Sequence, residues 1–312
     1  MDLDALVRDT AAALAAPSTL DSLARDPYWP KWEGGWWQML LLWELGCARA
    51  IPRAAADALA DSLDRNCMHE FPLRVEDVPA GRDPIRGVPC HCQLGTVYQV
   101  LHACGVDVDA RLPWLRPWFL RYQLPDGGLN CDEAVYLRER PRSSIVSTLP
   151  PLEAILHCTP RDFTPEEARF LDRGAEYLLA RRLWRSLSKG GAVIDESWGR
   201  LTFPRYYLYD LLRGLAFLAR WAEVRGRALP REATAEAVAA IERASLPDGT
   251  LAPGRRAVDG TKTLRRDARG EWQKGQPAGS FPLLDVVGAP GVSSPWLTRE
   301  WDVTRGRLAS MA

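Results

Sequence analysis

The chain has 312 residues, 46% of them hydrophobic, and its 40 basic residues balance its 40 acidic residues. This composition can bury a large core, and we expect one domain over residues 1–312. No stripe of basic and aromatic residues is present to neutralise a phosphate backbone, and no apolar run reaches the roughly 20 residues of a membrane span, so neither a nucleic-acid partner nor a transmembrane segment is expected.

Two kinds of predicted helix alternate along the chain. Strand-like alternation is rare, whereas apolar residues recur at three- and four-residue spacing, so the sequence predicts an all-α fold. Helices that are apolar on all sides are normally buried, and helices with one charged face cover them. The apolar set is predicted at 35–47, 92–104, 143–157 and 205–221, and the charged-face set at 53–66, 112–123, 165–183 and 231–245.

The alternation repeats at roughly 50 to 60 residues, as expected for antiparallel helical hairpins that form an inner and an outer ring, an α/α toroid. Two connections support the repeat, because Leu124–Leu129 and Leu246–Leu251 both begin Leu-Pro-Asp-Gly, in which Pro stops a helix and Gly accepts a positive φ. Residues 252–294 are rich in Gly, Pro and basic residues, and we expect either an ordered loop over the mouth of the toroid or a mobile segment. A last helix is predicted from Trp296 to Leu308.

One segment carries a family resemblance. Trp118-Phe119-Leu120-Arg121-Tyr122-Gln123, followed by Asp126-Gly127-Gly128, resembles the repeat of squalene cyclases and protein prenyltransferase β subunits, within the terpenoid cyclase and prenyltransferase superfamily. The resemblance implies an α/α toroid that binds an apolar or isoprenoid-like small molecule in its cavity. The chain departs from the family in lacking the Asp-x-Asp-Asp and Asp-Asp-x-x-Asp motifs, so ordinary polyene cyclisation is not implied.

Cysteines supply the sharpest functional hypothesis. Seven are present, an odd number, and their spacing does not resemble a secreted disulfide framework, so we expect reduced thiols. The N-terminal residues show no signal-peptide pattern, which predicts a cytoplasmic protein. Cys90, His91 and Cys92 open a predicted inner helix, and Cys131 lies in the loop before the next, so these groups converge if inner helices begin at one mouth. Thiolate and imidazole are ligands that Zn²⁺ prefers, and a catalytic zinc has three protein ligands and an open position.

Cys90 or Cys92, with Cys131 and either His91 or His157, could supply this zinc site. The resemblance adds that prenyltransferases hold zinc with Asp, Cys and His, and lanthipeptide-type cyclases on a similar toroid with Cys, Cys and His, to activate a thiol. The alternative is that these cysteines are packed as small buried hydrophobes.

Other side chains are candidates for catalysis or substrate binding. Asp132 and Asp195, each followed by a glutamate such as Glu133, could act as acids or bases, or could cap helices. Arg205 could hold an anionic group, or could form a buried pair with Asp210. Tyr206 and Tyr209 could hold the apolar part of the same substrate, or simply pack. Trp36 and Trp37 could stabilise a cationic substrate through their ring quadrupoles, or belong to the core.

These observations favour an enzyme, a zinc-assisted transferase or cyclase. The alternative is a non-catalytic toroid that binds a ligand or serves as a scaffold. The fold does not decide between the enzyme and the binding protein. They differ in whether the thiols and carboxylates at the mouth form a site.

Overall fold

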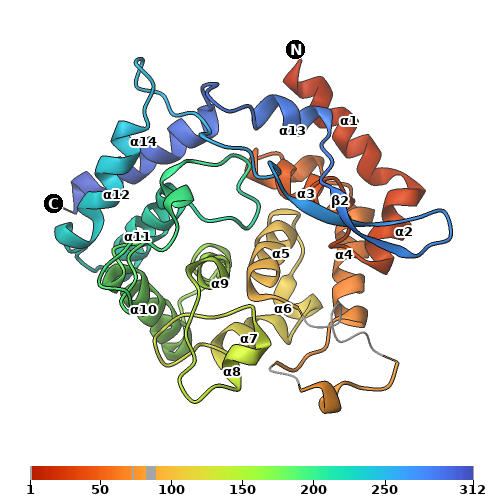
Figure 1. Cartoon of the computed structure of the whole chain (residues 1–312), viewed down its shortest axis with the longest axis horizontal. Helices are drawn as coiled ribbons and strands as arrows, with labels where there is room; N and C mark the ends of the chain where they lie inside the picture. The colour runs from red at the N-terminus through yellow and green to blue at the C-terminus, as the bar shows by residue number, and fades with distance from the viewer. Residues whose placement is uncertain (1, 72–73, 82–88, 312) are drawn as a thin grey trace.

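The computed structural model describes residues 2–71, 74–81 and 89–311. It is mostly helical, which confirms the predicted class (Figure 1). Among the described residues, no helix is both long enough and apolar enough to cross a membrane. The helices are α1 Leu3–Ala15, α2 Pro17–Arg25, α3 Gly35–Glu44, η1 Ala48–Ala50, α4 Arg53–Asn66, η2 Val75–Asp77, α5 His91–Ala103, α6 Val108–Arg111, α7 Leu115–Arg121, α8 Glu133–Tyr136, α9 Ile145–Cys158, α10 Pro165–Ala180, η3 Glu196–Gly199, α11 Leu211–Arg225, α12 Arg231–Arg243, α13 Pro282–Val287 and α14 Pro295–Ser310.

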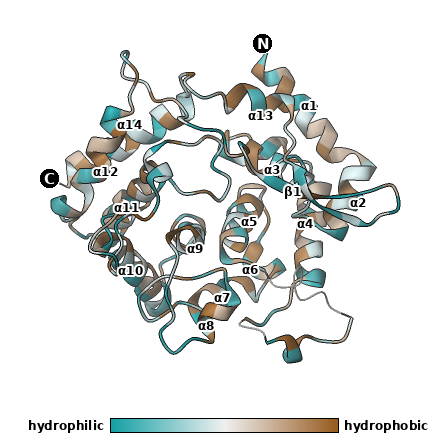
Figure 2. Cartoon of the chain, viewed as in Figure 1, coloured by the Kyte–Doolittle hydropathy of each residue, from teal (hydrophilic) through white to brown (hydrophobic). Residues whose placement is uncertain are grey.

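The apolar helices supply most of the core. Nearly every residue of α9 is buried, and most of α3, α5 and α11 is buried as well. In Figure 1, α5 and α9 lie near the middle of the view, and α4, α7, α10 and α12 lie outside them. The hydropathy colouring of Figure 2 shows brown, apolar residues concentrated on α9 and mixed colours on the outer helices, as the sequence pattern predicts.

The outer helices use local signals that the sequence displays. Thr164 caps α10 through a capping box with Glu167, and Pro165 occupies the first turn, where its missing N–H is not needed. Residues buried on one side of α10 pack against α9, and α12 packs in the same way against α11. Each outer helix therefore contributes one apolar face to the core.

The two Leu-Pro-Asp-Gly turns have the same hydrogen bonds. Leu124 N–H donates to Gly128 O at 2.8 Å, and Leu246 N–H donates to Thr250 O at 2.8 Å. Gly127 and Gly249 have φ of 93° and 81°, the left-handed region that Gly enters without strain. The internal repeat read from the sequence is thus a repeat of backbone geometry.

Residues 252–294 contain more regular structure than the sequence predicts. Strands β1 (Lys262–Arg266) and β2 (Trp272–Pro277) form an antiparallel hairpin, and α13 follows it. The strands were missed because neither alternates apolar and polar residues, and only Thr263 is buried on them.

A close approach at Gly95 joins the two central helices. A Cβ atom at this position would collide with the backbone of Pro150 and Pro151 in α9. Gln99, one turn further along α5, donates its amide to Pro150 O at 3.4 Å. Glycine is required here by backbone contact rather than by φ.

We predict that Gly95→Ala lowers the free energy of unfolding by at least about 1–3 kcal/mol, because α5 and α9 must separate to admit the methyl group. Gly306→Ala is the control, since Gly306 lies in α14 with open space around its Cα. There the gain in helix propensity should stabilise the chain by up to about 1 kcal/mol. Urea unfolding followed by circular dichroism measures both, and equal effects would contradict the packing argument.

Candidate metal centre and a neighbouring cavity

Three sulfur atoms lie together at the N-terminal end of α5. The Sγ atoms of Cys90 and Cys92 are 3.3 Å apart, and those of Cys92 and Cys131 are 3.6 Å apart. All three lie within 4.8 Å of one another. Cys92 is buried, whereas Cys90 and Cys131 are partly accessible. The predicted convergence of these residues is therefore present, and we call them the sulfur group.

Neighbouring elements hold Cys131 against α5. Its backbone N–H donates to Ser147 Oγ of α9 at 3.1 Å, and the Cys92 N–H donates to Cys131 Sγ at 3.5 Å. The preceding residue is fixed as well, because Asn130 N–H donates to Tyr136 Oη at 3.0 Å. The sulfur group thus depends on contacts among α5, α8 and α9.

His91 does not belong to the sulfur group, although it lies between two of its members in sequence. Its Nδ1 accepts from Trp118 Nε1 at 3.1 Å, and its Nε2 lies 3.0 Å from Tyr136 Oη. Because Nδ1 accepts, Nε2 carries the proton and donates it to Tyr136. Burial lowers the pKa of His91 to about 4, so the ring is neutral near pH 7. The other proposed imidazole, His157, lies at the far end of α9.

Hydrogen bonding within the sulfur group separates the pKa values of its thiols. A hydrogen bond between its thiol and that of Cys90 holds the pKa of Cys131 well below its usual value. Hydrogen bonds to Cys131 raise the pKa values of Cys90 and Cys92, and burial adds to the rise. Without a metal, Cys131 therefore carries the negative charge of the group most readily.

Lys31 is a functional candidate that the sequence did not reveal. Its ammonium donates to Tyr207 Oη at 3.1 Å and lies 4.9 Å from the ring centroid of Tyr28. Burial lowers the pKa of Lys31, while the nearby Cys90 and Cys92 oppose that shift. One signal was present: the chain has only four lysines, and this one stands within an aromatic run.

The rings around Lys31 form a continuous aromatic cluster. Trp32 packs on Trp37 with centroids 4.7 Å apart and on Tyr207 at 5.8 Å. Trp37 is fully buried, whereas Tyr207 is partly accessible. We define the aromatic cluster as Tyr28, Trp29, Trp32, Trp37, Tyr206 and Tyr207.

The candidate acids cap short helices. Asp132 is exposed and accepts from Ala134 N–H to cap α8, and Asp195 is exposed and accepts from Ser197 N–H to cap η3. Glu133 lies in the first turn of α8. Capping, the alternative weighed for both aspartates, is the contact that the structure shows.

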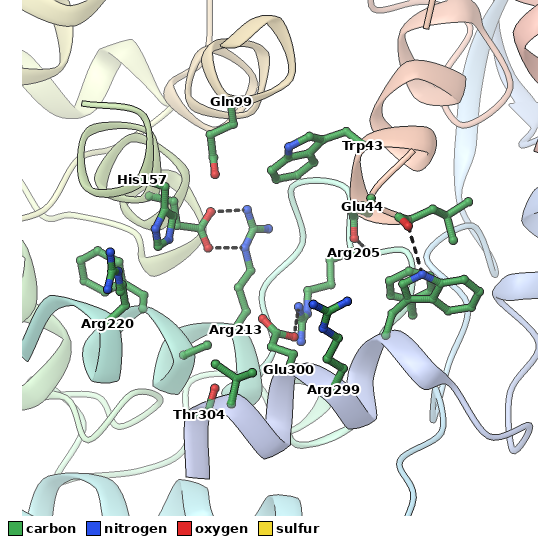
Figure 3. A pocket seen from close by; sticks show the side chains of 18 of the residues that line it. Trp43, Glu44, Gln99, His157, Arg205, Arg213, Arg220, Arg299, Glu300 and Thr304 are labelled. Carbon is green, nitrogen blue, oxygen red and sulfur yellow. Dashed lines mark hydrogen bonds and ion pairs between the residues drawn. The ribbon is translucent and has the colours of Figure 1, made fainter. Parts of the chain in front are cut away.

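A cavity of about 510 Å³ lies at the opposite ends of the inner helices (Figure 3). Gln99 of α5, His157 of α9 and Arg213 of α11 point toward it from three helices. Gln99 is about two helical turns from Cys92, so roughly 10 Å of α5 separates the levels of the cavity and the sulfur group. The two sites therefore occupy opposite ends of α5.

Arg205 and Tyr206 line this cavity, but the other proposed binding residues do not. Arg205 Nε donates to Asp210 at 2.8 Å, so the alternative of a buried pair is also realised. Tyr209 is buried and donates its hydroxyl to Leu183 O. Trp36 and Trp37 are 1% and 0% exposed and belong to the core, because α3 turns them inward.

Glu44 at the end of α3 is an unusual carboxyl in the cavity wall. It accepts the backbone N–H groups of Arg205 at 2.7 Å and Tyr206 at 2.5 Å. Burial nevertheless raises its pKa from 4.5 to about 7, against the opposing effects of those donors and of the guanidinium groups of Arg213 and Arg205. Glu44 is thus poised to change charge near neutral pH.

We predict that Glu44 makes the folded chain less stable as pH rises. The folded state keeps a proton that the unfolded state releases near pH 4.5, so the free energy of unfolding falls between about pH 4.5 and 7. Glu44→Gln should remove this contribution, whereas Glu242→Gln, exposed on α12, should not. Urea unfolding at pH 5 and 7.5 measures the slope, and an unchanged slope in Glu44→Gln would contradict the assignment.

Comparison with known proteins gives no match: no protein-family model, curated protein or solved structure is significantly similar to this chain.

Proposed function

We propose that the chain is a zinc-assisted enzyme, a transferase or cyclase, that acts on an apolar or isoprenoid-like small molecule. The observation that carries the proposal is the sulfur group, in which three thiols from two segments 39 residues apart in sequence meet beside a lysine and an aromatic cluster. Cys90, Cys92 and Cys131 are its ligand residues, and Ser147 holds Cys131 in place.

The donor set fits zinc. With Zn–S bonds of about 2.3 Å and tetrahedral angles, two ligand sulfurs lie about 3.8 Å apart. The separations of 3.3 and 3.6 Å require only small adjustments. Three thiolates would leave one position open, where a bound zinc would activate a substrate thiol or water.

The surroundings favour thiolates over thiols. Cys90 is the N-cap of α5 and Cys92 lies in its first turn, where the helix dipole stabilises negative charge. Lys31 places an ammonium near the same two residues, which offsets the net negative charge that three thiolates and one Zn²⁺ would carry. The hydrogen bond from Cys131 N–H to Ser147 Oγ, and that from Asn130 N–H to Tyr136 Oη beside it, keep the loop of Cys131 in place.

The aromatic cluster supports an apolar substrate. Tyr28, Trp29 and Tyr207 are partly accessible. The ammonium of Lys31 lies within 5.5 Å of the centroid of each of these three rings. Trp32 and Tyr206 both have positive φ, at 75° and 57°, a strained conformation for bulky residues that concentrates at functional sites. An apolar substrate packed on these rings would lie near the sulfur group, because Tyr28 and Tyr207 both interact with Cys90 and Cys92.

The helix arrangement supports an α/α toroid. The apolar helices α3, α5, α9 and α11 contact one another in order, and the outer helices cover them. The N-terminal ends of α5 and α9 share the sulfur group through Ser147, as the toroid hypothesis requires of inner helices that begin at one mouth. This arrangement is also compatible with a non-catalytic binding or scaffold protein, which the exposed, capping positions of Asp132 and Asp195 favour.

We predict about one zinc per chain in untagged protein purified without added metal. Cys131→Ala removes one of three ligands and should lose most of that metal, whereas Cys104→Ala, a thiol outside the sulfur group, should keep it. Elemental analysis beside circular dichroism separates metal loss from unfolding. No metal in the wild type, even after incubation with zinc, would refute the zinc mechanism and leave the binding-protein alternative.

We further predict that Lys31→Met weakens zinc binding by roughly tenfold, the size of effect typical of residues just outside the ligand shell. The substitution keeps the apolar stem but removes the cation that offsets thiolate charge. Lys189→Met, at an exposed position, is the matched control. Competition with a chromogenic chelator measures the affinity, and equal values for both variants would show that Lys31 serves packing alone.

A further inference from the structure

The cavity at the opposite end of α5 has more donors than its own residues use. Arg205 is 8% exposed, and its Nη2 has no hydrogen-bond partner. Thr304 of α14 is 1% exposed, and its Oγ1 also lacks a partner. Both residues line the cavity, although each of these two atoms has less than 1 Å² of accessible surface. A small rotation of either side chain would bring its unused donor to a molecule bound in the cavity.

The charges of the cavity favour an anion. Five arginines and three glutamates line it, an excess of two positive charges when Glu44 is ionised and of three when it is protonated. The carboxylates are already engaged: Glu153 pairs with Arg213 at 2.6 Å, Glu300 pairs with Arg205 at 2.6 Å, and Glu44 accepts two backbone N–H groups. Arg299, which projects from α14, makes no ion pair among the described residues (Figure 3). An entering anion would therefore meet an unpaired guanidinium.

The remaining wall is aromatic. Phe203 and Trp296 stack with centroids 5.1 Å apart at an angle of 7°, and Trp43 and Phe217 also line the cavity. The volume of about 510 Å³ lies within the range of small-molecule sites. The walls thus suit a molecule with one charged end and one apolar end.

We propose that this cavity binds a small organic anion, a carboxylate or phosphate monoester joined to an apolar body. Arg299 and Arg205 take the charged group, Thr304 donates to it, and the stacked Phe203 and Trp296 contact the apolar part. The site lies at the other end of α5 from the sulfur group, so this proposal does not rest on zinc. A carboxylate and a phosphate monoester share the negative charge and the acceptor oxygens that these donors recognise, and the experiment distinguishes the two head groups.

The test is isothermal titration of the full chain with phenyl phosphate, phenylacetate and the neutral benzyl alcohol. We expect at least one anion to bind at least tenfold more tightly than benzyl alcohol, and the tighter anion identifies the head group. Arg299→Gln should weaken that anion about tenfold, the effect of losing one hydrogen bond to a charged group. Arg305→Gln, on the same helix and paired with Asp302 outside the cavity, should change the affinity less than twofold.

Thr304→Val tests the site without the risk of unfolding. Because its hydroxyl has no partner, the variant should keep its melting temperature or gain about 2 °C, while its affinity for the anion falls about threefold. Cys131→Ala should bind the anion as the wild type does, which separates this proposal from the zinc mechanism. The proposal is overturned if neither anion binds better than benzyl alcohol, or if Arg299→Gln and Arg305→Gln behave alike.

Discussion

The contact between Gly95 of α5 and the Pro150–Pro151 backbone of α9 determines where both candidate sites form. It sets the distance between two helices whose opposite ends carry different chemistry. At their N-terminal ends, this distance lets Ser147 hold Cys131 against Cys92. Further along the same helices, it brings Gln99 and Glu153 into one cavity wall. A shift of α9 along α5 would disturb both sites together.

Helix polarity favours the thiols at one end but not the arginines at the other. Peptide dipoles make the N-terminus of a helix favourable for negative charge, and the thiols, which must lose protons to bind a metal, lie at the start of α5. In the cavity, Arg213 lies in the first turn of α11 and Glu44 is the last residue of α3, so both charges oppose the dipole of their own helix. There the ion pairs of Arg213 with Glu153 and of Arg205 with Glu300 compensate the buried charge instead.

The sequence predicted the helices and the meeting of the three cysteines, but not the residues that complete the site. Periodicity identifies a buried helix, and a shared helix start implies that Cys92 and Cys131 converge. Successive residues of a helix project about 100° apart, so His91 and Cys92 face different neighbours. Periodicity does not show which of the two faces Cys131, and in the structure His91 points toward Trp118 instead. Lys31 was missed for a different reason: it lies in an irregular segment before α3, whose path no periodic pattern specifies.

The segment from Arg205 to Tyr207 forms a wall shared by both sites, and one carboxylate holds it. Glu44 accepts the N–H groups of Arg205 and Tyr206, which fixes the backbone at the point where φ of Tyr206 is 57°. A conventional φ at that residue would redirect the chain on either side. With it, Arg205 faces the cavity and pairs with Glu300, while Tyr207 reaches the ammonium of Lys31. The strain at Tyr206 is therefore what allows three consecutive residues to serve two sites with different chemistry.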